Sequence, residues 1–219
     1  MRKLNPKSYD YIHTLVPAEN NLMMESRSHA EQIGLNAISV SATEGHLIKY
    51  FLQSIQAEKV VEIGTLTGLS AHYILNSIPG NGYLWTLEKS PEHAAKAEVT
   101  LAKEIKNKRC EILIGDAREK LLELSMKAPF DAVFIDGNKA AYWDYFQWAF
   151  SHIKVDGLIL VDNTFLSGAV WGEATEQKFN NKQIDAVKKM NEFAFNSQSL
   201  STCMIPTLEG LLVCRKIKE

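Results

Sequence analysis

The stretch that decides the fold is FDAVFIDGNKAAYWDYF, residues 130–146. Its first part, Phe130–Ile135, is a short apolar run with β-branched residues, which predicts a buried strand. The run ends at Asp136 and Gly137, and the next helix is expected to start near Lys139. Ligands bind at the carboxyl ends of the strands of an open parallel sheet. Asp136 is therefore placed either for chemistry or as the cap of that helix.

Predicted strands and helices alternate on both sides of this stretch. Besides residues 130–135, apolar runs predict strands over residues 59–63, 83–88, 109–114 and 157–161. Helices are expected over residues 70–78 and 91–107, from the third strand to residue 126, from 139 to 153, and over 177–196. This alternation is typical of βαβ units in a parallel, doubly wound sheet.

The two ends of the chain depart from this pattern. Predicted strands at residues 200–205 and 211–216 are joined by too few residues for a parallel crossover, so the last strand should be antiparallel. The fold class predicted is therefore α/β, a seven-stranded, mostly parallel, Rossmann-like sheet flanked by helices. Residues 1–56 form a helical N-terminal extension, and residues 57–219 form the α/β core. No linker or repeat divides the chain, so residues 1–219 are expected to form one domain.

The composition excludes several classes of partner. The net charge of −2 gives no general attraction to nucleic acid or to an anionic membrane. The N-terminal sequence MRKLNPKSYDYI lacks the apolar segment of a signal peptide, and no apolar run is long enough to span a bilayer. The three cysteines, Cys110, Cys203 and Cys214, are scattered without CxxC spacing, as expected of reduced thiols. We expect a cytoplasmic protein without nucleic-acid or membrane partners.

The first βα turn, EIGTLTGLS at residues 62–70, has features of a cofactor site. Glycines in such a turn let a ligand approach the backbone, and the helix that follows presents free amides. The spacing GxxxG differs from the GxGxxG of a pyrophosphate loop, and Glu62 would repel a pyrophosphate. S-adenosylmethionine carries an amine as well as a carboxylate and tolerates this acid better. A plain tight turn without a ligand remains the alternative.

Two further strand ends carry polar residues. Glu88 ends the second strand, where an acid accepts hydrogen bonds from ribose hydroxyls, so an adenosine-type ligand is indicated. Asp116 and Ala117 end the third strand, where they could touch the edge of an adenine ring. Asp116 could equally cap the helix that follows, and both roles are compatible.

A candidate metal site combines two strand ends that should be neighbours. Asp136 ends the fourth strand, and Asp162 with Asn163 ends the fifth. Two carboxylates and an amide suit Mg²⁺, or another hard divalent cation such as Ca²⁺ or Mn²⁺, and leave positions open for substrate. Neither His nor Cys joins the set, which disfavours zinc.

These motifs resemble those of the metal-dependent, class I S-adenosylmethionine-dependent O-methyltransferases of the caffeoyl-CoA and catechol O-methyltransferase type. VVEIGTLTGLSA (60–71) is similar to their first cofactor motif, and FDAVFIDGNKAAYWDY (130–145) to their metal and lysine motif. GLILVDNTFLSGAV (157–170) resembles their second metal motif, and IPTLEGLLVCRK (205–216) their closing hairpin. The resemblance covers nearly the whole chain in the same order.

The resemblance implies a role for each matched residue. The cofactor-binding residues would be Val40, Glu62, Gly64, Thr65, Ser70, Glu88, Ala117, Asp136 and Asn138. Within that set, Glu62 to Ser70 would hold the methionine part, Glu88 the ribose and Ala117 the adenine end. The metal ligands would be Asp136, Asp162 and Asn163, and the catalytic residues Lys139 and Asp136. A homodimer is also implied.

The implied reaction transfers a methyl group to a hydroxyl of a small aromatic substrate, of the catechol type with two adjacent hydroxyls. A phenol has a pKa near 10, and binding to a divalent cation lowers it. Lys139 could accept the phenol proton or orient the oxygen; a solvated lysine at a helix start is the alternative. Asn138, Ser167 and Glu209 differ from the residues usual in plant members, which leaves the aromatic acceptor open.

Two other function classes are compatible with the predicted fold. One is a nicotinamide-dependent oxidoreductase, against which the glycine spacing and the oxygen-only ligand set argue. The other is a non-catalytic binding protein on a methyltransferase scaffold. Against it stands the intact set of Asp136, Asp162, Asn163 and Lys139.

Overall fold

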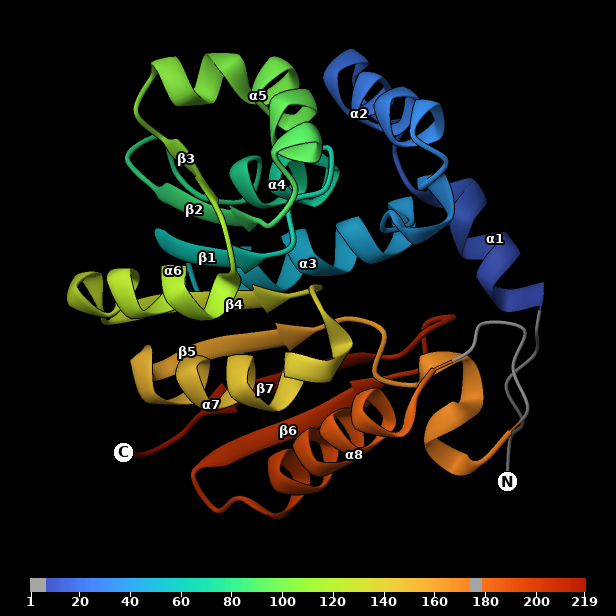
Figure 1. Ribbon diagram of the computed structural model, residues 1–219, viewed down its shortest axis with the longest axis vertical. Helices are drawn as coiled ribbons and strands as arrows, with labels where there is room; N and C mark the ends of the chain where they lie inside the picture. Colours follow the sequence, from blue (N-terminus) through green and yellow to red (C-terminus); the bar gives the residue numbers. More distant parts are fainter. Residues whose placement is uncertain (1–6, 174–178) are drawn as a thin grey trace.

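The computed structural model describes residues 7–173 and 179–219, and its centre is one seven-stranded sheet (Figure 1). The strands are β1 (Lys59–Ile63), β2 (Tyr83–Glu88), β3 (Cys110–Ile114), β4 (Phe130–Ile135), β5 (Ile153–Val161), β6 (Leu200–Ile205) and β7 (Leu211–Lys216). Their order in the sheet is β3-β2-β1-β4-β5-β7-β6. Strand β7 is antiparallel to both of its neighbours, β5 and β6. The predicted fold class is therefore confirmed, including the antiparallel last strand.

Helices cover both faces of this sheet. They are α3 (Ala42–Ser54), α4 (Leu69–Leu75), α5 (Pro91–Lys106), α6 (Ala117–Leu124), α7 (Tyr142–His152) and α8 (Asn181–Asn196). Alternate residues of β4 show the division: Ala132 and Phe134 pack with α3, α4 and α5, whereas Val133 and Ile135 pack with α6, α7 and α8. Because both faces are covered, all six residues of β4 are buried, and five of them are apolar. The sixth, Asp131, accepts hydrogen bonds from the Glu58 and Lys59 amides.

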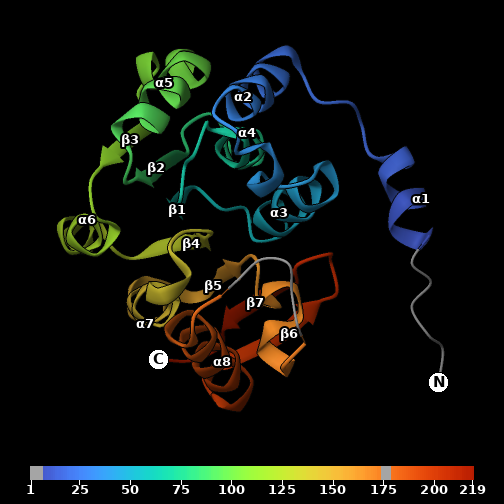
Figure 2. The ribbon, with the colours of Figure 1, turned by 45° about the vertical axis from the view of Figure 1, so that its right-hand side comes forward.

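The N-terminal extension is helical, as predicted, and its described residues form three helices. The first two are α1 (Lys7–Leu15) and α2 (Asn21–Gln32); the loop before α3 adds the 3₁₀ turn η1 (Asn36–Ile38). None of the nine residues of α1 is buried, and Figure 2 shows this helix standing away from the body. Helix α3 starts with a capping box, in which Ser41 and Glu44 bind each other's backbone amides. Such a box contributes about 1 kcal/mol and fixes where the loop ends.

Several element boundaries differ from the sequence prediction, and two of these differences lie next to β4. Strand β5 begins at Ile153 and not at Gly157, because Ile153 pairs with Phe130 ahead of a register shift in the β4–β5 ladder. The segment expected to be helical from Lys139 starts with the 3₁₀ turn η3 (Lys139–Ala141), and the α-helix begins at Tyr142.

The helix predicted over residues 177–196 is α8. It starts at Asn181 behind a capping box formed by Asn180 and Gln183. Gln177, the predicted first residue, lies outside the described residues. Within residues 7–173 and 179–219, no helix is long and apolar enough to cross a lipid bilayer.

Candidate active site

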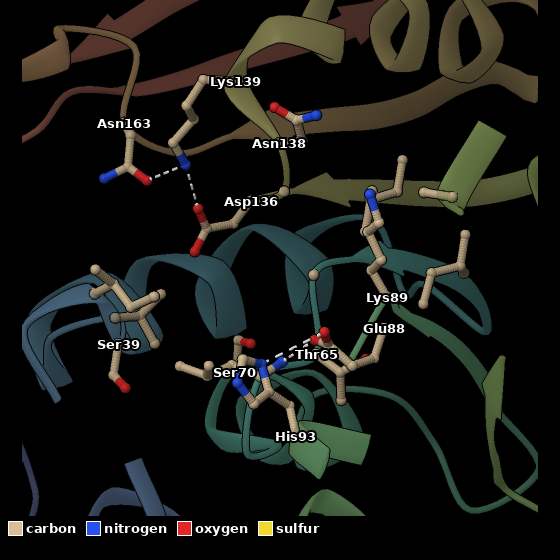
Figure 3. Close-up of a pocket in the computed structure, with 18 of the residues that line it drawn as sticks. Ser39, Thr65, Ser70, Glu88, Lys89, His93, Asp136, Asn138, Lys139 and Asn163 are labelled. Atoms are coloured by element: carbon tan, nitrogen blue, oxygen red, sulfur yellow. Dashed lines mark hydrogen bonds and ion pairs between the residues drawn. The ribbon is translucent and has the colours of Figure 1, made fainter. Parts of the chain in front are cut away.

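The carboxyl ends of β1, β2 and β4 open into a cavity of about 410 Å³ (Figure 3). The predicted site residues on its wall are Val40, Gly64, Thr65, Ser70, Glu88, Ala117, Asp136, Asn138, Lys139 and Asn163. They come from six separate segments of the chain, and the sheet topology brings them together. Two predicted residues lie behind the wall, because Glu62 is fully buried and Asp162 is 4% exposed.

The glycine turn after β1 has a backbone that only glycine adopts easily. Gly64 has φ +107°, and a Cβ atom there would lie 2.1 Å from the carbonyl oxygen of Asp136. Gly68, the N-cap of α4, has φ +91°. The turn therefore approaches the end of β4 closely and leaves the start of α4 open to the cavity.

Glu88 is held by the backbone on both sides. Its Oε2 accepts a hydrogen bond from the Leu66 amide at 2.8 Å, and its Oε1 accepts one from the Ser90 amide at 2.8 Å. His93 Nδ1 lies 3.6 Å from Oε1. The carboxylate is thus fixed at the cavity wall, where its remaining lone pairs can accept further hydrogen bonds.

Glu62 is connected to the cavity through two threonines. The Thr86 hydroxyl donates to Glu62 Oε2 at 2.5 Å, and the Thr65 and Thr86 hydroxyls lie 2.6 Å apart. Burial raises the pKa of Glu62 to about 8, although hydrogen bonds from Ser70 and Thr86 act in the opposite direction. The other oxygen, Oε1, is buried without a partner among the described residues.

The raised pKa of Glu62 predicts a pH-dependent stability of the ligand-free protein. Between about pH 4.5 and pH 8 the folded state holds a proton that the unfolded state has lost, so the free energy of unfolding falls as the pH rises. Glu62→Gln should remove this slope. Urea unfolding at pH 5 and pH 8 measures it, with Glu98→Gln on the exposed face of α5 as the matched control. Parallel curves for wild type and Glu62→Gln would contradict the prediction.

Lys139 lies at the centre of the other half of the site. Its Nζ donates to Asp136 Oδ1 at 2.7 Å, to Asn163 Oδ1 at 2.5 Å and to the Tyr142 hydroxyl at 2.6 Å. An ammonium has three N–H donors, so each has an acceptor here. Figure 3 shows Asp136 and Asn163 turned toward this nitrogen from two different strand ends.

The structure separates the two roles considered for Asp136. The side chain that caps the following turn is that of Asn138, which accepts from the Ala140 amide at 3.2 Å. The Asp136 carboxylate is directed to Lys139 instead. The helix-cap interpretation therefore applies to Asn138.

Asp162 lies behind these groups. Burial raises its pKa well above the usual range, and the negative charges of Asp136 and Glu44 raise it further. Its Oδ1 accepts a hydrogen bond from the Asn163 amide at 2.8 Å. Residues 7–173 and 179–219 contain no group of three His, Cys, Asp or Glu side chains suited to a metal ion. The predicted set has two acids, because its third member is the amide of Asn163.

Three residues of the site were not predicted from the sequence. Thr86 is paired with Glu62 in the β1–β2 register, and a threonine within the apolar part of β2 was the available signal. Tyr142 is fully buried at the start of α7, and its hydroxyl donates to the Asp162 carbonyl at 3.2 Å. Glu209 reaches the cavity from the β6–β7 connection and accepts from the Ser167 amide at 2.9 Å. No local pattern indicated that last contact.

The fold and the cavity together define a class of protein, the Rossmann-like methyltransferases. The sheet carries an antiparallel β7, and the cavity lies over the glycine turn after β1 and the acid that ends β2. Residues 14–217 match the O-methyltransferase family. The chain belongs to that family, and the family and enzyme class predicted from the sequence are confirmed.

Individual relatives agree with this assignment. A catechol O-methyltransferase of Niastella koreensis is 34% identical over 165 residues, covering 74% of this chain and 75% of that protein. A caffeoyl-CoA O-methyltransferase of Eucalyptus gunnii is 27% identical, covering 96% and 87%. The solved structure of the O-methyltransferase TomG from Streptomyces achromogenes, in complex with SAM, has a TM-score of 0.86 at 25% identity, covering 98% and 100%.

Proposed function

We propose that this protein transfers a methyl group from S-adenosylmethionine to a hydroxyl of a small aromatic compound that carries two adjacent hydroxyls. The observation that carries the proposal is the cluster of Asp136, Lys139 and Asn163 at one side of the cavity. It lies beside a wall whose polar groups suit the methyl donor. The names of the similar proteins, catechol and caffeoyl-CoA O-methyltransferase, support an aromatic acceptor.

The cofactor would lie along the glycine turn. Glu88, fixed by two amides, would accept hydrogen bonds from the ribose hydroxyls, and Ala117 at the start of α6 would contact the adenine. The methionine part would lie against Thr65, Ser70 and the open N-terminus of α4, where free amides attract its carboxylate. Val40 and Asn138 also line this cavity.

The residues present fit a hard divalent cation such as Mg²⁺. Oxygens of Asp136 and Asn163 already converge on one positive charge, the ammonium of Lys139. The carboxyl of Asp162 lies behind them, buried beside the negative charge of Asp136. Two carboxylates and an amide are the ligand types that Mg²⁺, Ca²⁺ and Mn²⁺ share. A cation bound there would lower the pKa of a phenol.

The protein's own side chains would position the acceptor hydroxyl or accept its proton. Asp136 and Tyr142 hold the Lys139 nitrogen at the wall of the cavity, where it would lie between the cofactor and the acceptor. From there Lys139 can exchange one of its three hydrogen bonds for one to the acceptor hydroxyl, which orients that oxygen or takes its proton. Both roles place the attacking oxygen against the methyl donor.

A methylation assay tests the proposal directly. Aromatic compounds with two adjacent hydroxyls should be methylated with S-adenosylmethionine and Mg²⁺, and excess EDTA should lower turnover at least about 100-fold until Mg²⁺ is restored. The matched control substrates carry one of the two hydroxyls already methylated and should not react.

The other outcomes separate the competing functions. Activity unaffected by chelation would refute the metal site. Binding of NAD without binding of S-adenosylmethionine would favour an oxidoreductase. Binding of S-adenosylmethionine without methylation of any compound would favour a non-catalytic binding protein.

A further inference from the structure

The hydroxyls of Thr86 and Thr65 form an ordered chain between buried Glu62 and the cavity. Thr86 donates its hydrogen to Glu62 Oε2 at 2.5 Å. A hydroxyl has one hydrogen, so Thr86 can only accept from Thr65, whose Oγ1 lies 2.6 Å away. The hydrogen of Thr65 is thereby committed as well. With Glu62 ionised, what Thr65 can still offer is lone pairs, so it accepts hydrogen bonds but cannot donate them.

This ordering matters because Thr65 is the member of the chain that lies on the cavity wall. Glu62 and Thr86 are both fully buried, and neither of them lines the cavity. The charge of Glu62 therefore reaches Thr65 through the hydroxyl of Thr86, beside the separate hydrogen bond that Glu62 accepts from Ser70. In the ligand-free protein burial raises the pKa of Glu62 to about 8, so near neutral pH its own O–H can donate to Thr86, and the chain can run in reverse with a hydrogen toward the cavity. A bound ammonium favours the ionised carboxylate, and with it the order in which Thr65 accepts.

We propose that Thr86 is a specificity-determining residue: it fixes Thr65 as an acceptor for the amino group of the cofactor's methionine part. The inference rests on the proposed cofactor, S-adenosylmethionine, whose ammonium is a donor. A chain of hydroxyls ending on a carboxylate favours that ammonium over a group without N–H. Thr86 acts through Thr65 and is a positioning residue, not a catalytic one.

The test compares two ligands that differ only in the amino group. These are S-adenosylhomocysteine and its deaminated analogue, in which hydrogen replaces the α-amino group, with both dissociation constants measured by calorimetry. Wild type should prefer S-adenosylhomocysteine. Thr86→Val keeps the shape but removes the hydroxyl, and should reduce that preference by about tenfold or more. Thr86→Ser restores the hydroxyl and should restore the preference.

A matched control separates specificity from general weakening of the turn. The Thr100 hydroxyl is also buried and lies 3.3 Å from the Thr67 carbonyl in the same glycine turn, but it does not reach Glu62. Thr100→Val should therefore change both affinities by the same factor. Thr65→Val is a second variant, which removes the terminal acceptor and leaves the Thr86–Glu62 bond in place. It should lose the preference in the same way.

Two results would overturn the inference. One is a Thr86→Val protein that keeps the full preference for S-adenosylhomocysteine. The other is a loss of affinity in Thr86→Val that is equal for both ligands, as a purely structural role requires. Failure of wild type to bind S-adenosylhomocysteine at all would be a different result, because it would overturn the proposed cofactor and this inference with it.

Discussion

Asp136→Ala is expected to abolish methyl transfer, with kcat lowered by roughly 10³-fold, while cofactor affinity stays within a few-fold of wild type. The Asp136 carboxylate holds Lys139 Nζ at 2.7 Å and belongs to the proposed cation site. Its backbone amide donates to the Ile63 carbonyl at 2.9 Å, and this bond survives the substitution. The glycine turn should therefore keep its shape. Turnover measured with saturating acceptor, together with calorimetry of S-adenosylhomocysteine, gives both quantities.

The controls for this prediction lie on the same segment. Asp144 is an exposed acid in the first turn of α7, and Asp144→Ala should keep kcat within about twofold. Asp136→Asn keeps the shape and one acceptor oxygen but removes the charge, so it should stay close to Asp136→Ala in kcat. An active Asp136→Ala enzyme would reduce Asp136 to a structural residue of the turn.

The strands could be predicted closely because their sequence pattern is set by burial. β1, β2, β4, β6 and β7 have the predicted bounds. The short connection before β7 was enough to predict its antiparallel direction, since geometry excludes a crossover. Where pairing with a distant residue sets the end of a strand, the local sequence pattern did not predict that end. The start of β5 depends on the pairing of Ile153 with Phe130, which the sequence around Ile153 does not show.

The site could be predicted as a set of residues but not as a network. Asp136, Asp162 and Asn163 follow strands, so their approximate position is a consequence of topology. The contacts that connect the residues are between side chains from different elements. The sequence predicted Glu62 as a cofactor residue, yet its link to the cavity runs through Thr86 on the neighbouring strand. Such contacts depend on register and rotamer, which local patterns do not specify.

One backbone contact joins the cofactor half of the site to the half around Lys139. Gly64 lies at the end of β1 and Asp136 at the end of β4, and these strands are adjacent in the sheet. Because the space between Gly64 and the Asp136 carbonyl holds no Cβ, the two strand ends stay close. This closeness brings the proposed methyl donor and Lys139 to one cavity.

Gly64→Ala should therefore be strongly destabilising and also impair both ligand binding and turnover. The new Cβ would lie 2.1 Å from the Asp136 carbonyl oxygen, and φ at +107° is unfavourable for any L-residue. Together these effects should cost at least about 3 kcal/mol. For a chain of this length the melting temperature should fall by about 6–12 °C, measured by calorimetry of the ligand-free protein.

Two other glycines separate the contributions to this loss. Gly34 has φ +71° with open space around its Cβ position, so Gly34→Ala measures the backbone cost alone. Gly80 has open space and is not among the glycines with positive φ, so Gly80→Ala should change stability by no more than about 1 kcal/mol. The steric contribution at Gly64 is the amount by which the loss of stability in Gly64→Ala exceeds the loss in Gly34→Ala. A displaced Asp136 and a lower kcat should accompany it. A Gly64→Ala protein no less stable than Gly34→Ala would show that the two strand ends can separate freely, and that their contact does not hold the two halves of the site together.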